Sequence, residues 1–331
     1  MIRLPDLLPM RPHLREMVWG GRRLHELYRK RLPADRPIGE SFELSGYPGR
    51  ESVVASGPLE GRDLGALLAE YREELVGRRV WSDAEGRFPL LVKLLDARQD
   101  LSIQVHPDDR HAREQGLPDR GKTEAWFVLH AEGGRVACGL RPGVDRERFE
   151  AGIRQGRVME LVQFHPVQAG DVVFLPAGVV HALCSGVVVY EVQQSSDLTF
   201  RVHDYGRLGL DGRPRELHLD QALAVIDFAG EAVAPRSWRE YPGAARGEAV
   251  LVECPYFRLV FHAPGAEGRG HAAQESFQGV TVVDGQARLS AGREECRVRA
   301  GDTVLIPASR GFGVEPAASG SCTYLVATAS A

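Results

Sequence analysis

An eight-residue segment that occurs twice constrains the fold of this 331-residue chain. Gly170-Asp-Val-Val-Phe-Leu-Pro-Ala177 is matched by Gly301-Asp-Thr-Val-Leu-Ile-Pro-Ala308, and six of the eight positions are identical or exchange one aliphatic residue for another. Each copy reads as a short strand that ends at a Pro-Ala turn, so we predict two copies of one β-module. His181 of the first copy corresponds to Phe312 of the second, which predicts that the second copy lacks a site built on this histidine.

The composition favours a mainly β fold with a few short helices. The chain has 37 glycines and 20 prolines, many of them between short apolar or alternating runs. We predict strands over 38–45, 88–96, 101–106, 122–129, 135–141, 187–193, 249–262, 279–290, 295–299, 302–306 and 322–328. The segment 171–182 is predicted to be a strand, a Pro-Ala-Gly turn and the start of a second strand. Short helices are expected over 64–71, 145–154, 156–164 and 217–227. The remainder of 1–50, the segments 110–121 and 195–207, and a linker over 230–248 are expected to be irregular.

The charge and the cysteine content limit which partners and which cellular compartment we expect for the protein. The net charge of −4 implies no polyanionic partner, so we expect no nucleic-acid binding. No apolar run approaches the ~18–20 residues that span a bilayer, and the N-terminus lacks the apolar segment of a signal peptide. Five scattered cysteines fit reduced thiols better than a disulfide framework. We therefore expect a cytoplasmic protein with no membrane partner.

Leu101-Ser-Ile-Gln-Val-His106 places two polar side chains on one face of a predicted strand. Gln104 and His106 are two residues apart, while Ile103 and Val105 point to the opposite face. A polar face of this kind is a suitable place for two ligands of a metal ion. Further ligands are expected from neighbouring elements, because a divalent metal needs three or four.

Glu124 and His181 are the candidates for the remaining ligands. Glu124 lies on the next strand, and His181 follows the Pro-Ala-Gly turn. Two histidines, a carboxylate and an amide oxygen suit Zn²⁺, and also Mn²⁺, Fe²⁺ or Co²⁺. Spacing alone leaves open that these four are unrelated polar residues.

Lysine is rare in this chain, which makes each one informative. Of the 41 lysines and arginines, only three are lysines: Lys30, Lys93 and Lys122. Lys122 shares a strand face with Glu124, and Lys93 is the only cation of an apolar strand; a solvated strand end is the alternative for both. Glu191 lies in another apolar strand, where an unpaired carboxylate would be costly, so it requires a cation or a catalytic task.

Two arginines follow in the next predicted loop. Arg201 and Arg207 lie near Asp197 and Asp204. Loop arginines suit bidentate capture of a phosphate group, although an ordinary surface ion pair is an equal alternative for Arg207.

Four motifs occur in the order of a known family: Gln104-Val-His-Pro-Asp-Asp, Gly121-Lys-Thr-Glu-Ala-Trp, the segment 170–182, and the segment 191–205 that ends in Arg-Val-His-Asp-Tyr. They resemble type I phosphomannose isomerase, in particular its short bacterial form, over roughly residues 10–220. The resemblance implies two double-stranded β-helix (cupin) modules, one Zn²⁺ per chain, and interconversion of mannose 6-phosphate and fructose 6-phosphate through a cis-enediol. Residues 1–235 would form a catalytic cupin domain with the metal site, and 236–331 a degenerate cupin domain without metal ligands.

Carried over by motif, the metal ligands would be Gln104, His106, Glu124 and His181. Arg201, Lys122 and Glu191 would be catalytic, with either Lys122 or Glu191 as the base. Ser102, Lys93, Asp197 and Arg207 would contact the substrate. The helical insertion of the long form is missing, so closure over the substrate would come from residues 1–30 and 195–215. The substrate would be a small sugar phosphate, and the protein a monomer or a homodimer.

Three other functions stay open at this stage. An Fe²⁺ dioxygenase would favour a histidine-rich ligand set, which argues against it here. A non-catalytic sugar-phosphate sensor would need only some of Lys122, Glu191 and Arg201. An isomerase for a related or unphosphorylated sugar is the hardest to separate, because the periphery of the pocket cannot be inferred from the motifs.

Overall fold

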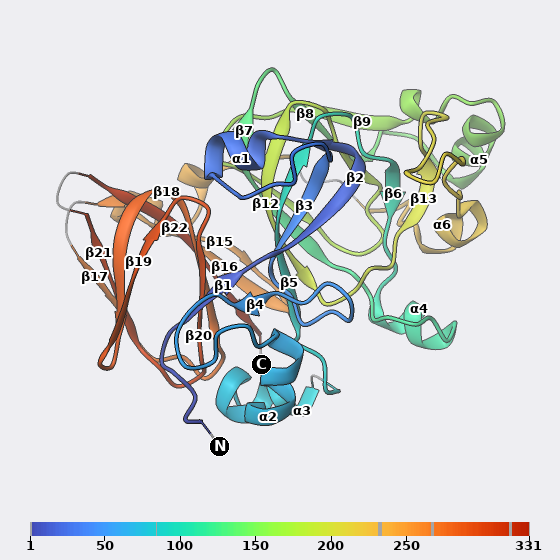
Figure 1. Cartoon of the computed structure of the whole chain (residues 1–331). Helices are drawn as coiled ribbons and strands as arrows, with labels where there is room; N and C mark the ends of the chain where they lie inside the picture. The colour runs from blue at the N-terminus through green and yellow to red at the C-terminus, as the bar shows by residue number, and fades with distance from the viewer. Residues whose placement is uncertain (1, 84, 231–233, 266–267, 318–319, 331) are drawn as a thin grey trace.

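The computed structural model describes residues 2–83, 85–230, 234–265, 268–317 and 320–330. The chain forms two β-barrels that lie side by side, with helices at the edges (Figure 1). The mainly β fold with two cupin modules is confirmed. No helix in the described parts of the chain is long and apolar enough to cross a membrane.

The first barrel is built from two sheets. The seven-stranded sheet has the order β14 (Arg236–Ser237), β10 (Asp171–Leu175), β7 (Glu124–Ala131), β12 (Val187–Gln194), β5 (Leu90–Ala97), β3 (Ile38–Leu44) and β2 (His13–Gly21). The five-stranded sheet has the order β13 (Phe200–His203), β6 (Ile103–Val105), β11 (His181–Leu183), β8 (Arg135–Leu140) and β9 (Val162–Pro166).

The second barrel is formed by one ten-stranded sheet. Its main path is β15 (Glu248–Glu253), β16 (Phe257–Gly265), β22 (Cys322–Ala329), β18 (Gln278–Ala291), β20 (Thr303–Ile306), β1 (Leu8–Arg11) and β4 (Val53–Val54). Strands β17 (Arg269–His271), β19 (Glu294–Arg299) and β21 (Phe312–Pro316) branch from it. The N-terminal strands β1 and β4 thus extend the sheet of the C-terminal barrel, through antiparallel pairing of β1 with β20.

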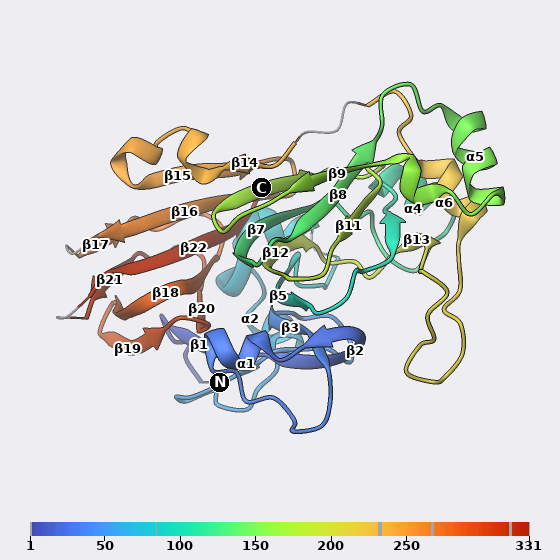
Figure 2. The ribbon, with the colours of Figure 1, turned by 90° about the horizontal axis from the view of Figure 1, so that it is seen from above.

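Helices and single 3₁₀ turns connect the strands. The helices are α1 (Arg23–Tyr28), α2 (Leu64–Val76), α3 (Arg78–Asp83), α4 (Asp109–Glu114), α5 (Arg146–Arg154) and α6 (Leu219–Val225). The 3₁₀ turns are Val158–Glu160, Trp238–Glu240 and Ala244–Arg246. Viewed from above, α5 and α6 lie at the far end of the first barrel, and the loop between β13 and α6 projects beyond the sheets (Figure 2).

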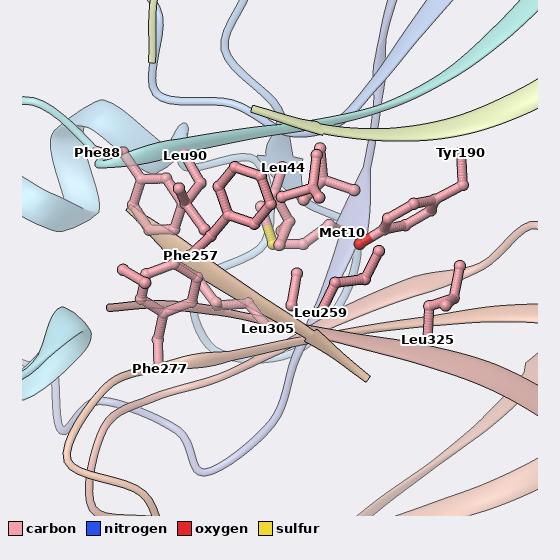
Figure 3. Packing of buried hydrophobic residues seen from close by; sticks show 14 of the residues in the cluster. Met10, Leu44, Phe88, Leu90, Tyr190, Phe257, Leu259, Phe277, Leu305 and Leu325 are labelled. Carbon is pink, nitrogen blue, oxygen red and sulfur yellow. The ribbon is translucent and has the colours of Figure 1, made fainter. Parts of the chain in front are cut away.

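The central strands of the first barrel are buried on both faces. Leu90 and Tyr190 point away from the first barrel and lie in one apolar cluster with Leu259 and Leu325 of the second (Figure 3). The alternate residues of β5 and β12 point into the first barrel. Burial on both faces explains why these strands read as nearly continuous apolar runs rather than as alternating ones.

The repeated octapeptide has the same backbone conformation in both copies. Gly170 and Gly301 both have φ +93°, and eight residues later Gly178 (φ +89°) and Ser309 (φ +61°) are both left-handed. Strand β11 begins at His181, and β21 begins at the equivalent residue, Phe312. The two copies thus have positive φ at the same two positions, which supports the predicted duplication.

Several sequence-based predictions were wrong. The segment 110–121 contains α4, which begins after an Asp108 cap that accepts a hydrogen bond from the His111 amide. A helix was expected over 156–164, but a 3₁₀ turn leads there into β9. The supposed loop 195–207 contains β13, and the supposedly irregular N-terminus contains β1, β2 and α1. The run 249–262 is two strands, and β17 and β21 were missed. Within the expected linker 230–248, residues 231–233 lie outside the described parts.

Two histidines lie in the interior of the second barrel. His262 stacks on Tyr324, and His271 stacks on Phe312 while its Nε2 lies 2.7 Å from the Tyr324 hydroxyl. Burial, reinforced by the neighbouring His271 and Arg269, lowers the pKa of His262 to about 3. Burial and Arg269 lower the pKa of His271 to about 4. Both rings are therefore neutral in the folded protein at any pH above about 5.

We expect the free energy of unfolding to decrease as the pH falls from about 6.5 to about 4. The unfolded chain takes up protons on both histidines in this window while the folded chain does not, so acid favours unfolding. Replacing His271 by Gln removes one titrating group. It should therefore reduce the slope of the free energy of unfolding against pH by up to ~1.4 kcal/mol per pH unit. Urea unfolding at four pH values measures it, with His130→Gln on β7 as the control. Equal slopes for wild type and His271→Gln would contradict the expectation.

Candidate active site

Three buried side chains meet between the two sheets of the first barrel. His106, which follows β6, and His181, which opens β11, come from the five-stranded sheet, and Glu124 opens β7 of the facing sheet. Their ligand atoms all lie within 4.8 Å of one another. His106 Nε2 lies 3.5 Å from Glu124 Oε2, and His181 Nε2 lies 3.2 Å from Glu124 Oε1.

Gln104 completes this group. It pairs directly with His181 across β6 and β11, so the two side chains share a face. Its side-chain amide nitrogen lies 3.4 Å from His181 Nε2, while its oxygen accepts a hydrogen bond from Ser102 Oγ at 3.2 Å. Turning the amide by 180° presents its oxygen to the same point as the two histidine nitrogens. The structure thus brings together all four residues that the sequence predicted as ligands.

The donor set fits a divalent metal. A tetrahedral zinc ion with bonds of ~2.0–2.1 Å has ligand atoms about 3.3 Å apart, close to the separations found here. Both Glu124 oxygens are buried without a hydrogen bond of good geometry. His181 Nδ1 lies 2.9 Å from the carbonyl oxygen of Val179; as donor there, it leaves the Nε2 lone pair free for a metal.

The protonation states suit metal binding as well. Burial and the Lys122 ammonium lower the pKa of His106 to about 3. Burial alone would raise the pKa of Glu124, but Lys122 and the two histidines outweigh it and hold that pKa well below its usual range. A neutral imidazole and an ionised carboxylate are the forms in which these groups bind metals.

Lys122 lies directly against the ligand group. Its Nζ is 2.7 Å from Glu124 Oε2 and 3.2 Å from His106 Nε2, and the side chain is buried. This position follows from the predicted strand face, on which Lys122, Glu124 and Trp126 alternate with residues of the opposite face. A solvated strand end is excluded for this lysine.

Glu191 and Lys93 form a buried ion pair beside the ligand group. They are direct partners across β12 and β5, and Lys93 Nζ lies 3.0 Å from Glu191 Oε1. Trp126 Nε1 donates to Glu191 Oε2 at 2.8 Å, and Lys93 also approaches Glu40 Oε1 at 3.5 Å. Burial alone would lower the pKa of Lys93, but Glu191 and Glu40 reverse this and raise it. Lys93 is thus the cation that Glu191 requires.

A cavity of about 700 Å³ opens in front of these groups. The predicted residues that line it are Lys93, Ser102, Gln104, Lys122, Glu191, Asp197 and Arg201. His106, Glu124 and His181 lie behind this lining. Arg207 is not part of the lining: it binds Asp204 through Nε at 2.9 Å and Nη2 at 2.6 Å.

Sequence reasoning missed several residues of the cavity, namely Arg15, Glu40, Arg215 and His218. Glu40 could have been predicted from the sequence by the reasoning applied to Glu191, because it too is a carboxylate inside a buried strand. Arg15 pairs with Glu40 at 3.1 Å, and Arg50 pairs with Asp197 at 2.7 Å. These contacts between distant segments left no local pattern in the sequence.

The first barrel, with two histidines, a glutamate and a glutamine converging from facing sheets, defines a cupin of the metal-binding class. Comparison with known proteins narrows this class. Residues 7–133 match the family described as "Phosphomannose isomerase type I, catalytic domain". A mannose-6-phosphate isomerase of Streptococcus mutans is 34% identical over 305 residues, which cover 92% of this chain and 93% of the relative. The chain belongs to the type I phosphomannose isomerase family.

Solved structures agree in fold. The crystal structure of the mannose 6-phosphate isomerase from Bacillus subtilis has a TM-score of 0.84 and 31% sequence identity, covering 98% of this chain and 99% of that one. A zinc-bound structure of a mannose 6-phosphate isomerase has a TM-score of 0.77 at 18% identity, covering 99% of this chain and all of that one. The second likeness concerns the fold alone.

We expect the protein to bind about one equivalent of a divalent metal, and Glu124→Gln to lose it. Metal bound at 100 times its dissociation constant raises the free energy of unfolding by about 2.7 kcal/mol, so the melting temperature of wild type should rise on addition of Zn²⁺. Elemental analysis and thermal melts measure both effects. His130→Ala, on the same strand β7, is the control that should keep the metal. Full metal content in Glu124→Gln would contradict this assignment.

Replacing Lys93 by Met should lower the free energy of unfolding by about 3–5 kcal/mol, because it leaves buried Glu191 without its cation. Urea unfolding measures the loss. Arg110→Met removes a solvent-exposed ion pair with Glu114 and should leave stability unchanged. If both variants unfold like wild type, the buried pair is not needed for stability.

Proposed function

We propose that the chain is a metal-dependent aldose–ketose isomerase that interconverts mannose 6-phosphate and fructose 6-phosphate. The observation that carries the proposal is the buried ligand group of His106, Glu124, His181 and Gln104, with Lys122 touching two of its atoms, at the base of a cavity large enough for a hexose phosphate. Family membership supports the same activity, since the relatives of Streptococcus mutans and Bacillus subtilis are mannose-6-phosphate isomerases.

Zinc is the first metal to test, supported by the donor set and by the zinc bound in a solved isomerase of the same fold. A divalent metal in this position supplies a Lewis acid that stabilises negative charge on the sugar oxygens as it develops. The protein supplies the geometry: His181 is oriented by its contact with Val179, and Gln104 by its contact with Ser102.

The isomerisation moves a proton between C2 and C1 of the open-chain sugar through a cis-enediol. We assign this proton transfer to Lys122, which would act as a base in its uncharged form, since its Nζ lies at the ligand group and faces the cavity. Glu191 is held on both oxygens, by Lys93 and by Trp126, so its part is to fix Lys93 and the wall of the cavity. Of the two bases that the sequence left open, this proposal takes Lys122.

Arg201 is placed to balance charge near the reacting carbons. It pairs with Gln104 across β13 and β6, so its side chain leaves the sheet beside a proposed ligand. Its Nη1 donates to the carbonyl oxygen of Glu216 at 2.7 Å, and its Nε is buried without a hydrogen-bond partner. An unpartnered buried donor at this point is available to a substrate oxygen.

The two barrels are assigned different roles. We propose that residues 1–235, apart from β1 and β4, supply the ligands and the cavity, and that residues 236–331 mainly serve as a scaffold against the back of the seven-stranded sheet. We propose that the substrate is a small sugar phosphate and the compartment the cytoplasm.

The decisive experiment assays mannose 6-phosphate against free mannose with Zn²⁺, Co²⁺ or Mn²⁺ added to metal-depleted protein. We expect isomerisation of the phosphorylated sugar, dependent on metal. Activity on free mannose alone would instead identify an isomerase for unphosphorylated sugars, and binding without turnover would identify a sensor.

Arg201→Lys tests the assigned arginine. It keeps the charge but removes the planar fork, so we expect turnover to fall by about 10- to 100-fold. Steady-state kinetics with mannose 6-phosphate measure the change, and Arg213→Lys on the neighbouring exposed loop is the matched control. Unchanged turnover together with unchanged substrate affinity in Arg201→Lys would refute the role.

A further inference from the structure

The charges around the cavity are unevenly distributed between its two ends. At one end, Lys93, Arg15 and Arg50 are matched by Glu191, Glu40 and Asp197, in pairs 2.7–3.5 Å apart. Three cations therefore face three anions, and this end carries no excess charge.

The opposite end holds three arginines and one buried carboxylate. Arg207 and Arg215 both bind Asp204, which they share, and Arg201 makes no ion pair within 4 Å to any residue that the structure describes. Asp204 and the mostly exposed Glu216 partly offset the positive charge at Arg201, although neither forms an ion pair with it within 4 Å. Burial lowers the pKa of Arg201, and the charge of Arg215 lowers it further. Binding of an anion would reduce the electrostatic repulsion between positive charges crowded in this way.

Only some of these arginines face the cavity. Arg201, Arg215 and His218 line it, whereas Arg207 is turned away and donates to the carbonyl oxygen of Asp100, in the segment that leads to β6. Asp204 thus holds Arg207 and Arg215 on either side of a hairpin whose tip spans Leu208–Pro214. Arg207 anchors this hairpin to the barrel, and Arg215 is presented to the cavity with its guanidinium already oriented.

The hairpin also forms the rim of the cavity. Gly209 donates its amide to the carbonyl oxygen of Arg213 at 2.7 Å, and Gly209, Leu210 and Asp211 line the opening. Leu210 is 58% exposed although it is at the mouth of the cavity. A ligand that reaches Arg215 would pass beneath this rim.

We propose that Arg215 binds the phosphate group of the substrate at the hairpin end of the cavity, beyond Arg201, and that Arg207 serves only to position the hairpin that carries Arg215. The order along the cavity is then the ligand group, Arg201, and Arg215, which places C1 and C2 of the sugar at the metal end and the phosphate at the hairpin. This inference rests on the proposed function for the identity of the sugar. The sequence analysis proposed Arg207 as a residue that contacts the substrate. We propose Arg215 instead as the residue that selects phosphorylated substrates.

The test compares Arg215→Gln with Arg213→Gln in metal-loaded full-length protein. Arg213 is an exposed arginine of the same hairpin that does not line the cavity, so the two variants lose the same charge in the same loop. Calorimetry with inorganic phosphate measures binding, and kinetics with mannose 6-phosphate separate KM from kcat. We expect Arg215→Gln to weaken phosphate binding and raise KM by tenfold or more, with kcat within about threefold of wild type, and Arg213→Gln to change neither.

Arg215→Lys keeps a positive charge and the contact with Asp204, and should recover part of the phosphate affinity if the side chain binds the anion. Melting temperatures and metal content show whether each variant is folded. Phosphate affinity and KM in folded Arg215→Gln that match Arg213→Gln would overturn the proposal, as would failure of wild type to bind phosphate. A wild type that binds phosphate through Arg215 but does not isomerise mannose 6-phosphate would support the subsite while refuting the proposed reaction.

Discussion

Glu191 and Lys93 face each other across strands β12 and β5, in the sheet that separates the two barrels, and both side chains are buried. An ionised carboxylate placed there alone would cost several kcal/mol, so the pair has to form together and its geometry is tightly determined. Trp126 and Glu40 are then fixed by the same two charges. The rigidity of this end of the cavity therefore comes from electrostatics as much as from packing.

The same arrangement accounts for all three lysines of the chain. Lys30 pairs with buried Glu43 at 2.7 Å, Lys93 with Glu191, and Lys122 with Glu124. An ammonium is a compact charge with freely oriented donors, and it fits between two strands where a planar guanidinium would not. Each of the three lysines is thus paired with a buried glutamate.

The sequence predicted the ligand group because each part of it is local. Strand alternation placed Gln104 beside His106, and the turn before His181 carries its own glycine. The sequence could not predict that Arg207 anchors the hairpin while Arg215 faces the cavity. These roles depend on the side of the hairpin on which Asp204 holds each arginine. Strand β13 was missed although Phe200-Arg-Val-His alternates, because its polar neighbours resemble a loop. Helix α4 was missed although Asp108 is a good N-cap.

The wall between the barrels is one sheet thick. Leu94 of β5 contacts the second barrel, while its neighbour Lys93 faces the cavity. A substitution in the second barrel that shifts β5 along or across the sheet would therefore also move Lys93, a charged side chain in the cavity of the first barrel.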